Sequence, residues 1–266
     1  MVDREVRLPP IVDLTKPNDA RVYDYLLGGA HNFAVDRELA RQAVAAMPVL
    51  RQVALSNRAF LHRVVRVCVH AGVRQFLDLG SGIPGLGNVH EVAQAIDPRC
   101  AVAYVDVDPV VHAHGQLILS DTPGTALINE DLMNAEAVLE HPAVRGLLDF
   151  DEPIAVLGML ALHFVPDERD PEGALATYRD ALPVGSMLGL SHPAGDTTAE
   201  GVDEAIDVFS QGHMVPVARD LERLTGFFEG FELLEPGVTR VPNWRPDREG
   251  SEDVPVNGGL GVKSSR

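Results

Sequence analysis

The chain of 266 residues is 45% hydrophobic and 23% charged, which supplies enough apolar material for one large globular domain with a full core. Its formal net charge of −17, from 39 acidic and 22 basic side chains, argues against phosphate backbones and anionic lipid surfaces as partners, because no run of Lys or Arg offsets it. The first ten residues contain no apolar leader, and no stretch reaches about 18 uninterrupted apolar residues. We therefore expect a cytoplasmic protein that binds neither nucleic acid nor membrane.

The chain up to about residue 73 shows the apolar spacing of helices. Asn18 is placed to cap a short helix that runs through Tyr25 and Leu26 and ends at the Gly28-Gly29 pair. Further apolar residues at helical spacing predict helices over about 36–47 and about 53–71. A set of helices therefore precedes the main fold.

From Gln75 onward, short apolar runs bounded by Gly, Pro and Asp alternate with helical patterns. We predict strands near residues 75–79, 101–106, 124–129, 154–159 and 185–191. This alternation is typical of a parallel α/β sheet. Asp108-Pro109 and Asp170-Pro171 each place a capping Asp before a first-turn Pro, which marks the start of two helices.

The last part of the chain shows weaker patterns. Two stretches, at about 199–211 and about 219–228, have helical spacing. The apolar segments at about 231–235 and 256–262 are expected to pair as strands. Cys68 and Cys100 have neither C-x-x-C spacing nor a nearby His cluster, so we expect buried thiols rather than a disulfide or a metal site.

The segment QFLDLGSGIPGLGN, residues 75–88, holds a G-x-G-x-x-G pattern directly after the first predicted strand. Gly80 and Gly82 allow a tight turn that brings backbone N–H groups close to a ligand. Asp106, at the end of the next strand, is placed to hold ribose hydroxyls. Both NAD and S-adenosylmethionine are compatible with this much of the pattern.

Two further acids distinguish between these ligands. Asp78 stands two residues before Gly80, where its carboxylate would repel the pyrophosphate of a dinucleotide but attract the sulfonium and ammonium groups of S-adenosylmethionine. Asp131 follows the third strand, where it can accept a hydrogen bond from an adenine amino group. The sequence therefore favours S-adenosylmethionine and disfavours an NAD-dependent oxidoreductase, for which a second catalytic segment is also missing.

The order of these motifs resembles that of class I S-adenosylmethionine-dependent methyltransferases. The series comprises Asp78-x-Gly80-Ser81-Gly82, Asp106, Asp131-Leu132, Leu162-His163-Phe164 and the fifth-strand segment ALPVGSMLGLSH. More narrowly, the segments PNDARVYDYLLGGAHNFAVDRE, NRAFLHRVVRV, GNVHEVAQ, YVDVDPVV and PNWRPD resemble a bacterial family of S-adenosyl methyltransferases of unsettled substrate, over about residues 13–263. Two departures are local: Ala30 stands where the family commonly has Lys, and the ending GGLGVK differs from the family's GGVGRK.

This resemblance implies a Rossmann-like fold. It predicts a seven-stranded, mostly parallel sheet with an antiparallel last strand, supplied by the pair at 231–235 and 256–262. The helical pattern predicts an N-terminal extension over residues 1–73, which can cover the crevice at the carboxyl ends of the strands as a lid. One compact domain over residues 74–266 is expected to bind S-adenosylmethionine.

The resemblance also implies which residues face the cofactor. They are Asp78, Gly80, Ser81 and Gly82 at the methionine end, Asp106 at the ribose, Val107 at the adenine face, Asp131 and Leu132 at the adenine amino edge, and Met159 and Leu160 beneath the sulfur.

Several roles have two interpretations. Tyr23 and Asn32 either contact the cofactor from a lid or pack the helices onto the sheet. His163 is a candidate general base or a structural residue at a strand end, and Tyr23 is a second candidate for catalysis. Asp108 is assigned to a helix cap rather than to the site, and Trp244 to anchoring a loop rather than to stacking on a substrate.

The function predicted from these features is methyl transfer from S-adenosylmethionine to an unidentified small-molecule acceptor, with the oligomeric state undetermined. Most of the catalysis would be positional, because the sulfonium is already an activated leaving group. The alternative is a non-catalytic protein that binds S-adenosylmethionine or S-adenosylhomocysteine as a sensor or assembly partner.

Overall fold

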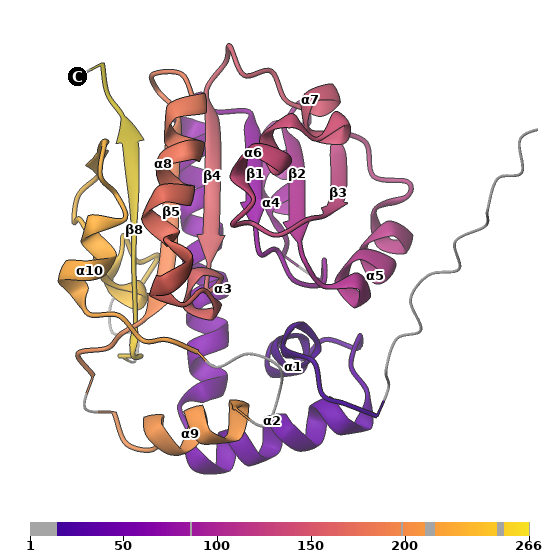
Figure 1. The fold of residues 1–266 in the computed structure, drawn as a ribbon, viewed down its shortest axis with the longest axis vertical. Coiled ribbons are helices and arrows are strands. Elements are labelled where there is room, and N and C mark those ends of the chain that lie inside the picture. Colours follow the sequence, from indigo (N-terminus) through magenta and orange to yellow (C-terminus); the bar gives the residue numbers. More distant parts are fainter. Residues whose placement is uncertain (1–14, 86, 198, 211–215, 249–252, 266) are drawn as a thin grey trace, which may run out of the picture.

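A mixed sheet of eight strands runs through the computed structural model, which describes residues 15–85, 87–197, 199–210, 216–248 and 253–265 (Figure 1). The strands are β1 (Gln75–Leu79), β2 (Ala101–Asp106), β3 (Thr125–Asn129), β4 (Ile154–Met159), β5 (Met187–Pro193), β6 (Phe231–Leu233), β7 (Thr239–Arg240) and β8 (Val256–Lys263). Their order is β3-β2-β1-β4-β5-β8-β6, and β7 pairs with β8. Strands β1 to β5 are mutually parallel, whereas β8 runs antiparallel to β5, β6 and β7.

The predicted fold class is confirmed. The expected seven-stranded frame is present, and the two-residue strand β7 adds an eighth member. The segments expected to pair near the end of the chain do so as β6 and β8, although β7 and a loop lie between them in the sequence.

Ten α-helices are assigned within the described residues. They are α1 (Asp19–Leu26), α2 (Ala34–Ala46), α3 (Leu50–His70), α4 (Val89–Ile96), α5 (Pro109–Leu119), α6 (Ala135–Glu140), α7 (Pro142–Leu147), α8 (Pro171–Ala181), α9 (Val202–Phe209) and α10 (Leu221–Gly226). None of the helices in these described ranges is long and apolar enough to cross a membrane.

The predicted helix starts are confirmed at atomic level. The side chains of Asn18, Asp108 and Asp170 each accept a hydrogen bond from a backbone N–H in the first turn of α1, α5 and α8. The helix expected over 199–211 is shorter, Val202–Phe209, and the end of the expected range lies outside the described residues. Helix α10 begins at Leu221 rather than 219, because Asp220 accepts from the Arg223 N–H and caps it there.

Alternate residues of each central strand point to opposite faces of the sheet, and both faces are buried. On β1, Phe76 packs into a cluster with α3, α4 and α5, whereas Leu77 packs into a cluster with α6, α7, α8 and α10. On β4, Leu157 and Val156 divide in the same way. Because both faces are buried, the sequences of these strands are nearly continuous apolar runs.

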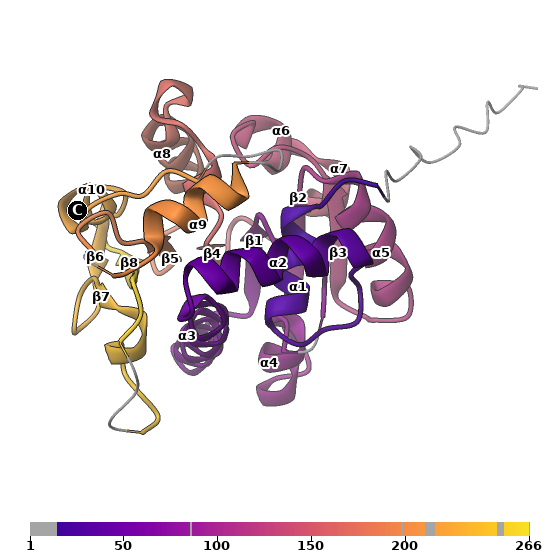
Figure 2. The ribbon, with the colours of Figure 1, turned by 90° about the horizontal axis from the view of Figure 1, so that it is seen from below.

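Helices α1, α2 and α9 lie across the carboxyl ends of the parallel strands (Figure 1). Seen from that end, α3 and α4 lie on one side of the sheet and α6 and α8 on the other (Figure 2). Helix α3 joins this end layer to the sheet, because Ala54 packs with α1 and α2 while Phe60 belongs to the core under the strands. Residues 1–14 of the predicted N-terminal extension lie outside the described residues.

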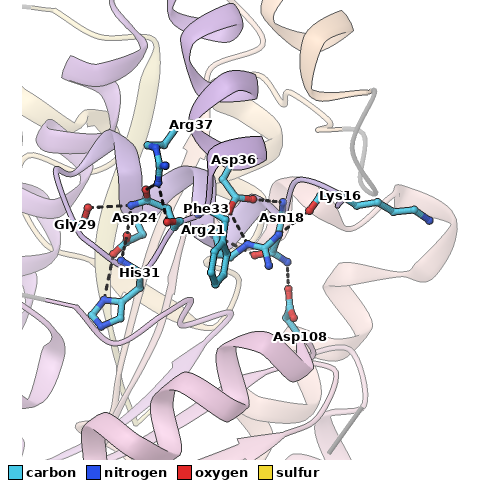
Figure 3. A network of polar contacts seen from close by, with 11 residues as sticks. Lys16, Asn18, Arg21, Asp24, Gly29, His31, Phe33, Asp36, Arg37 and Asp108 are labelled. Atoms are coloured by element: carbon cyan, nitrogen blue, oxygen red, sulfur yellow. Dashed lines mark hydrogen bonds and ion pairs between the residues drawn. The ribbon is translucent and has the colours of Figure 1, made fainter. Parts of the chain in front are cut away.

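A buried ion pair connects α1 to α2. Arg21 Nε lies 2.8 Å from Asp36 Oδ2, and the two side chains are 1% and 0% exposed (Figure 3). Asp36 also accepts hydrogen bonds from the backbone N–H groups of Asn18 (2.9 Å) and Phe33 (2.7 Å). These donors satisfy the carboxylate and so lower the cost of burying its charge, whereas Nε and Nη1 of Arg21 have no hydrogen-bond partner within the described residues.

One side-chain contact joins this layer to the sheet. The Asn18 amide donates to Asp108 Oδ2, while Asp108 Oδ1 accepts from the Val110 N–H at 2.7 Å (Figure 3). The same carboxylate therefore caps α5 and holds the start of α1 over the end of β2.

Strand β8 is predicted to be essential for the stability of the fold, because it lies between β5 and β6 in the sheet. Leu260, which is 0% exposed and belongs to the core cluster of α3, is the test residue. Leu260→Ala should lower the free energy of unfolding by about 2–5 kcal/mol in urea denaturation, through lost burial and the cavity left behind. The matched control Leu117→Ala, at a residue 80% exposed, should change it by about 0.5 kcal/mol or less. Equal effects of the two substitutions would contradict the assigned register.

Candidate functional site

A cavity of about 460 Å³ lies between the carboxyl ends of the parallel strands and helices α1, α3 and α9. Its volume is within the range of small-molecule sites, about 300–1,000 Å³. All but one of the predicted site residues line it, together with His163: Tyr23, Asp78, Gly80, Ser81, Gly82, Asp106, Val107, Asp131, Leu132, Met159 and Leu160. They meet because parallel strands place the residues that follow them at one edge of the sheet.

Asn32 is the predicted site residue that does not line the cavity. Its amide Nδ2 donates to Asp24 Oδ2 (2.8 Å) and to the Gly29 carbonyl (2.9 Å), and Arg37 donates to its Oδ1 (3.1 Å). Gly29 permits this turn, since a Cβ there would lie 2.1 Å from Asp24 Oδ1. Asn32 is thus bound into the loop between α1 and α2, and we leave it out of the proposed cofactor contacts.

The glycine turn after β1 is tight, as its sequence predicts. Gly80 and Gly82 adopt φ values of +66° and +64°, a region that residues with a Cβ rarely occupy. A Cβ on Gly80 would also lie 2.6 Å from the Ala161 Cβ, so the turn after β4 packs directly on this glycine. The backbone N–H groups of Gly80 and Ser81 both donate to the Val105 carbonyl of β2.

Asp106 is held by the backbone around it. Its Oδ2 accepts from the Gly82 N–H (2.8 Å) and its Oδ1 from the Asp108 N–H (2.9 Å). Burial raises the pKa of this carboxyl to about 6. A carboxylate has about four acceptor positions, so Asp106 can still receive hydrogen bonds from a ligand's hydroxyl groups.

Asp78 is buried in the cavity wall without such support. It is 7% exposed, and among the described residues no group donates a hydrogen bond to its carboxylate. Its pKa is raised to about 7, chiefly by burial; the positive charge of Arg58 opposes the shift and the nearby Asp106 adds to it. A buried carboxylate that lacks donors and faces a cavity favours a cationic ligand.

Arg58 of α3 is a cavity residue that the sequence did not reveal. Its Nη1 donates to Asn88 Oδ1 (3.0 Å), and its guanidinium lies 5.9 Å from the centre of the Tyr23 ring. Its Nε is buried and has no hydrogen-bond partner within the described residues. Arg58 therefore places a positive charge in the cavity lining next to the Asp78 carboxylate.

Asp131 lies at the end of the cavity nearest β3. Its Oδ1 accepts from the Met133 N–H (2.9 Å), and its Oδ2 pairs with Arg169 (2.8 Å). Arg169 also lines the cavity, but it belongs to none of the sequence motifs and was not predicted as a site residue. The ion pair orients the carboxylate and leaves lone pairs for a further donor.

His163 lies in the turn after β4 and is 9% exposed. Neither ring nitrogen has a hydrogen-bond partner within the described part of the chain, and Nδ1 is shut away from solvent. Burial, with the nearby His192 and Arg219, holds its pKa well below the ordinary value of 6.5. His163 is therefore a neutral imidazole with unused hydrogen-bonding capacity beside the cavity.

His192, by contrast, is fully engaged. Arg219 donates to its Nε2 (2.9 Å), so Nδ1 carries the proton and donates to the Pro193 carbonyl (2.9 Å). Trp244 likewise lies in the core, 0% exposed and edge-on to Phe60 at 5.4 Å between ring centroids. The anchoring interpretation of Trp244 is confirmed.

A chain of hydrogen bonds connects α1 to the turn after β4. Asn57 Nδ2 donates to the Tyr23 hydroxyl (3.0 Å), which donates to the Ala54 carbonyl (3.3 Å). Ser191 Oγ donates to Asn57 Oδ1 (2.6 Å) and accepts from the Leu160 N–H (3.0 Å). The Tyr23 hydroxyl is thus committed to the protein, and burial raises its pKa, which makes it a poor base.

Leu160 is itself unusual, because it adopts φ of +51° without being glycine. Such a conformation costs of the order of 1 kcal/mol and is found mostly where the surrounding structure fixes it. Here two acceptors of Ser191, the hydroxyl and the carbonyl (3.2 Å), hold the Leu160 N–H. The polar Asn57, in the middle of an otherwise apolar helix face, was the available sequence signal for this network.

Among the residues that the structure describes, no group of three or more His, Cys, Asp or Glu side chains is placed to hold a metal ion.

The sequence matches the family described as S-adenosyl methyltransferase over residues 6–264. The chain belongs to this family. A candidate methyltransferase from Thermobifida fusca has a similar structure, with 39% identity, coverage of 98% of this chain and 100% of that chain, and a TM-score of 0.90. A DUF574 family protein from Streptomyces avermitilis is 34% identical, covers 94% of this chain and 99% of its own, and gives a TM-score of 0.88.

Human N-acetylserotonin methyltransferase, solved in complex with S-adenosylmethionine, shares the fold at 11% identity, with a TM-score of 0.51 over 94% of this chain and 63% of that chain. A search among curated proteins finds no match.

Within the site, Asp78 should lower the stability of the ligand-free protein at neutral and alkaline pH. Its folded-state pKa of about 7 lies above the ordinary 3.8, so the folded protein holds the proton more tightly. The contribution of this tighter proton binding to folding stability is fully present below the ordinary pKa of 3.8 and is lost as the pH rises through about 7. Asp78→Asn should therefore raise the Tm relative to the unmodified protein at about pH 8, and less so at about pH 5.

The measurement is thermal unfolding by circular dichroism without added ligand. Asp121→Asn, at an exposed position, is the control and should leave the Tm unchanged at both pH values. A Tm that falls on Asp78→Asn at pH about 8 would mean that the ionised carboxylate is stabilised within the fold.

Proposed function

We propose that the protein transfers a methyl group from S-adenosylmethionine to a small-molecule acceptor. The observation that carries the proposal is Asp78, a buried carboxylate without donors in the cavity wall, next to an arginine with an unused buried N–H. An α-amino acid end matches this pair, because its ammonium complements Asp78 and its carboxylate complements Arg58. When bound, S-adenosylmethionine supplies an electrophilic methyl group on a positively charged sulfur.

The remaining cavity residues are assigned to the rest of that molecule. The turn Gly80–Gly82 faces the methionine end, and Asp106 receives the ribose hydroxyls. Val107 and Leu132 enclose the adenine, and Asp131 accepts from its amino group. Met159 and Leu160 lie beneath the sulfur, where the fixed turn after β4 defines the floor of the site.

A dinucleotide fits this wall poorly. Its pyrophosphate would meet the carboxylates of Asp78 and Asp106, and in a buried setting such like charges repel strongly. The same carboxylates favour a ligand with positive charge.

Membership of a methyltransferase family favours an enzyme over a non-catalytic sensor. The cavity also extends past the proposed donor residues to a region lined by α9 and the end of β5. A sensor that binds only the donor has no need for this second region, whereas a transferase must admit an acceptor.

We further propose that α1 and α2 cover the site, within the helical extension of residues 1–73. Tyr23 lines the cavity and is connected through Asn57 to the turn after β4. Such a cover excludes water from the reaction and orders the bound molecules.

Binding tests the donor assignment directly. Isothermal titration calorimetry should show micromolar binding of S-adenosylmethionine and S-adenosylhomocysteine, and none of NAD. Asp106→Ala should weaken binding by about 1–3 kcal/mol, because ribose hydroxyls lose their partner. Asp121→Ala, at an exposed position, is the control. NAD binding more tightly than either adenosyl compound would refute the assignment.

Hydrogen exchange tests the cover. Saturation with S-adenosylhomocysteine should slow amide exchange in α1, residues Asp19–Leu26, by about tenfold, since a bound ligand suppresses local opening. Helix α8, residues Pro171–Ala181, lines no part of the cavity and should be unaffected. If α1 exchanged equally fast with and without the ligand, the two helices would be structural packing rather than a cover.

A further inference from the structure

The region of the cavity beyond the proposed donor residues is apolar. It is enclosed by α1, the first half of α3, α9 and the end of β5, and its walls include Leu26, Leu50, Val53, Val202, Ile206 and Phe209. We call this region the apolar chamber. The helices that line it pack on one another, so its walls are part of the packed fold.

Charged residues divide sharply between the two parts of the cavity. Those within its described lining are Asp19, Arg58, Asp78, Asp106, Asp108, Glu130, Asp131 and Arg169. The acids lie at or just after the carboxyl ends of β1, β2 and β3, or begin α1. Arg58 approaches Asp78, and Arg169 pairs with Asp131. The described residues of the apolar chamber carry no charge, so a charged group placed there would lack a counter-ion, at a cost of several kcal/mol.

His163 stands at the boundary between the two parts. It follows β4, which lies between β1, with Asp78, and β5, whose end lines the chamber. It is nine-tenths buried and its ring nitrogens have no partner within the described residues. Burial, with the nearby His192 and the positive charge of Arg219, which donates to His192, keeps the imidazole neutral and able to accept a hydrogen bond.

We propose that the acceptor is an uncharged, hydrophobic small molecule with one neutral O–H or N–H group, which His163 binds at the boundary of the apolar chamber. This inference rests on the proposed function, since it assigns the second substrate of the same site. The walls of the apolar chamber limit the size and charge of the acceptor. His163 positions its reacting atom, because it is the only polar side chain among the described boundary residues without a hydrogen-bond partner.

The same imidazole accounts for the proton. When a neutral O–H is methylated, the O–H electron pair remains on oxygen as the new bond to carbon forms, and one proton is released. His163 takes that proton as a general base, and the positive charge of the imidazolium replaces the one that the sulfonium loses, so the total charge of the occupied site is unchanged. An acceptor that is already anionic would need no base and would find no cation in the chamber.

Matched probes test the class of acceptor. Naphthol, naphthoate and naphthylmethylammonium, substituted at the same ring position, differ mainly in charge. Titration calorimetry on the full chain, with and without S-adenosylhomocysteine, should show naphthol binding at least about tenfold more tightly than either ion, because the ions would be buried without partners. Equal or tighter binding of an ion, or no binding of naphthol, would overturn the proposal.

Variants locate the probe. Ile206→Arg, which adds a cation to the chamber wall, should reverse the preference in favour of naphthoate, whereas Ala205→Phe should fill the chamber and abolish naphthol binding. His163→Ala should weaken naphthol binding by about five- to tenfold, and His163→Gln, which keeps an acceptor, by less. None of these variants should change the Kd of S-adenosylhomocysteine by more than about twofold, since they do not contact its proposed site.

The two proposals fail in different ways. Absence of S-adenosylhomocysteine binding to the unmodified protein would contradict the proposed donor, while naphthol titration of the ligand-free protein would still decide the chemistry of the chamber. Naphthol binding that is unaffected by Ile206→Arg, Ala205→Phe and His163→Ala would place the probe elsewhere and overturn the acceptor assignment.

Discussion

Every part of the site depends on five strands running in the same direction. Because each crossover returns the chain to the opposite end of the sheet, the residues that follow β1 to β5 all emerge at one edge. Asp78 lies just before that edge and Asp106, Asp131 and Leu160 come at or after it, although more than eighty residues separate the first from the last in the sequence. Helices α1 and α9 then need only span this edge to enclose a cavity.

The two central carboxylates are stabilised in different ways, and the difference is informative. Asp106 receives backbone N–H groups from Gly82 and Asp108, which oppose the effect of burial on its pKa and tie the carboxyl group to the glycine turn, although burial still raises the pKa to about 6. Asp78 receives none from the described residues and retains a raised pKa. Among the described residues, Asp78 is therefore a buried carboxyl group without a hydrogen-bond donor, an arrangement that persists where binding offsets its cost.

The sequence predicted the parts of this structure that local rules determine. The strands have apolar runs bounded by turn residues, and the caps Asn18, Asp108 and Asp170 act within one helical turn. Both the strands and the caps could therefore be predicted from the sequence. The roles of Arg58 and Asn57 were not predicted, because the helical pattern defines only which face of α3 is buried. Their contacts arise where α3 packs against residues that are distant in the sequence. Asn32 was grouped with the site although its hydrogen bonds are local to its own loop.

The acidic lining near β1 to β3 has a consequence for turnover. The described lining there holds five carboxylates but only two arginines, Arg58 and Arg169. The carboxylates are those of Asp78, Asp106, Asp108, Glu130 and Asp131. The whole chain also has a net charge of −17. Such a field accelerates the encounter with a cation and is screened over about 8 Å at physiological ionic strength. The proposed donor carries a sulfonium charge that its spent form has lost. Electrostatic steering would therefore favour the arrival of fresh donor over the return of the product, without any contact that distinguishes their shapes.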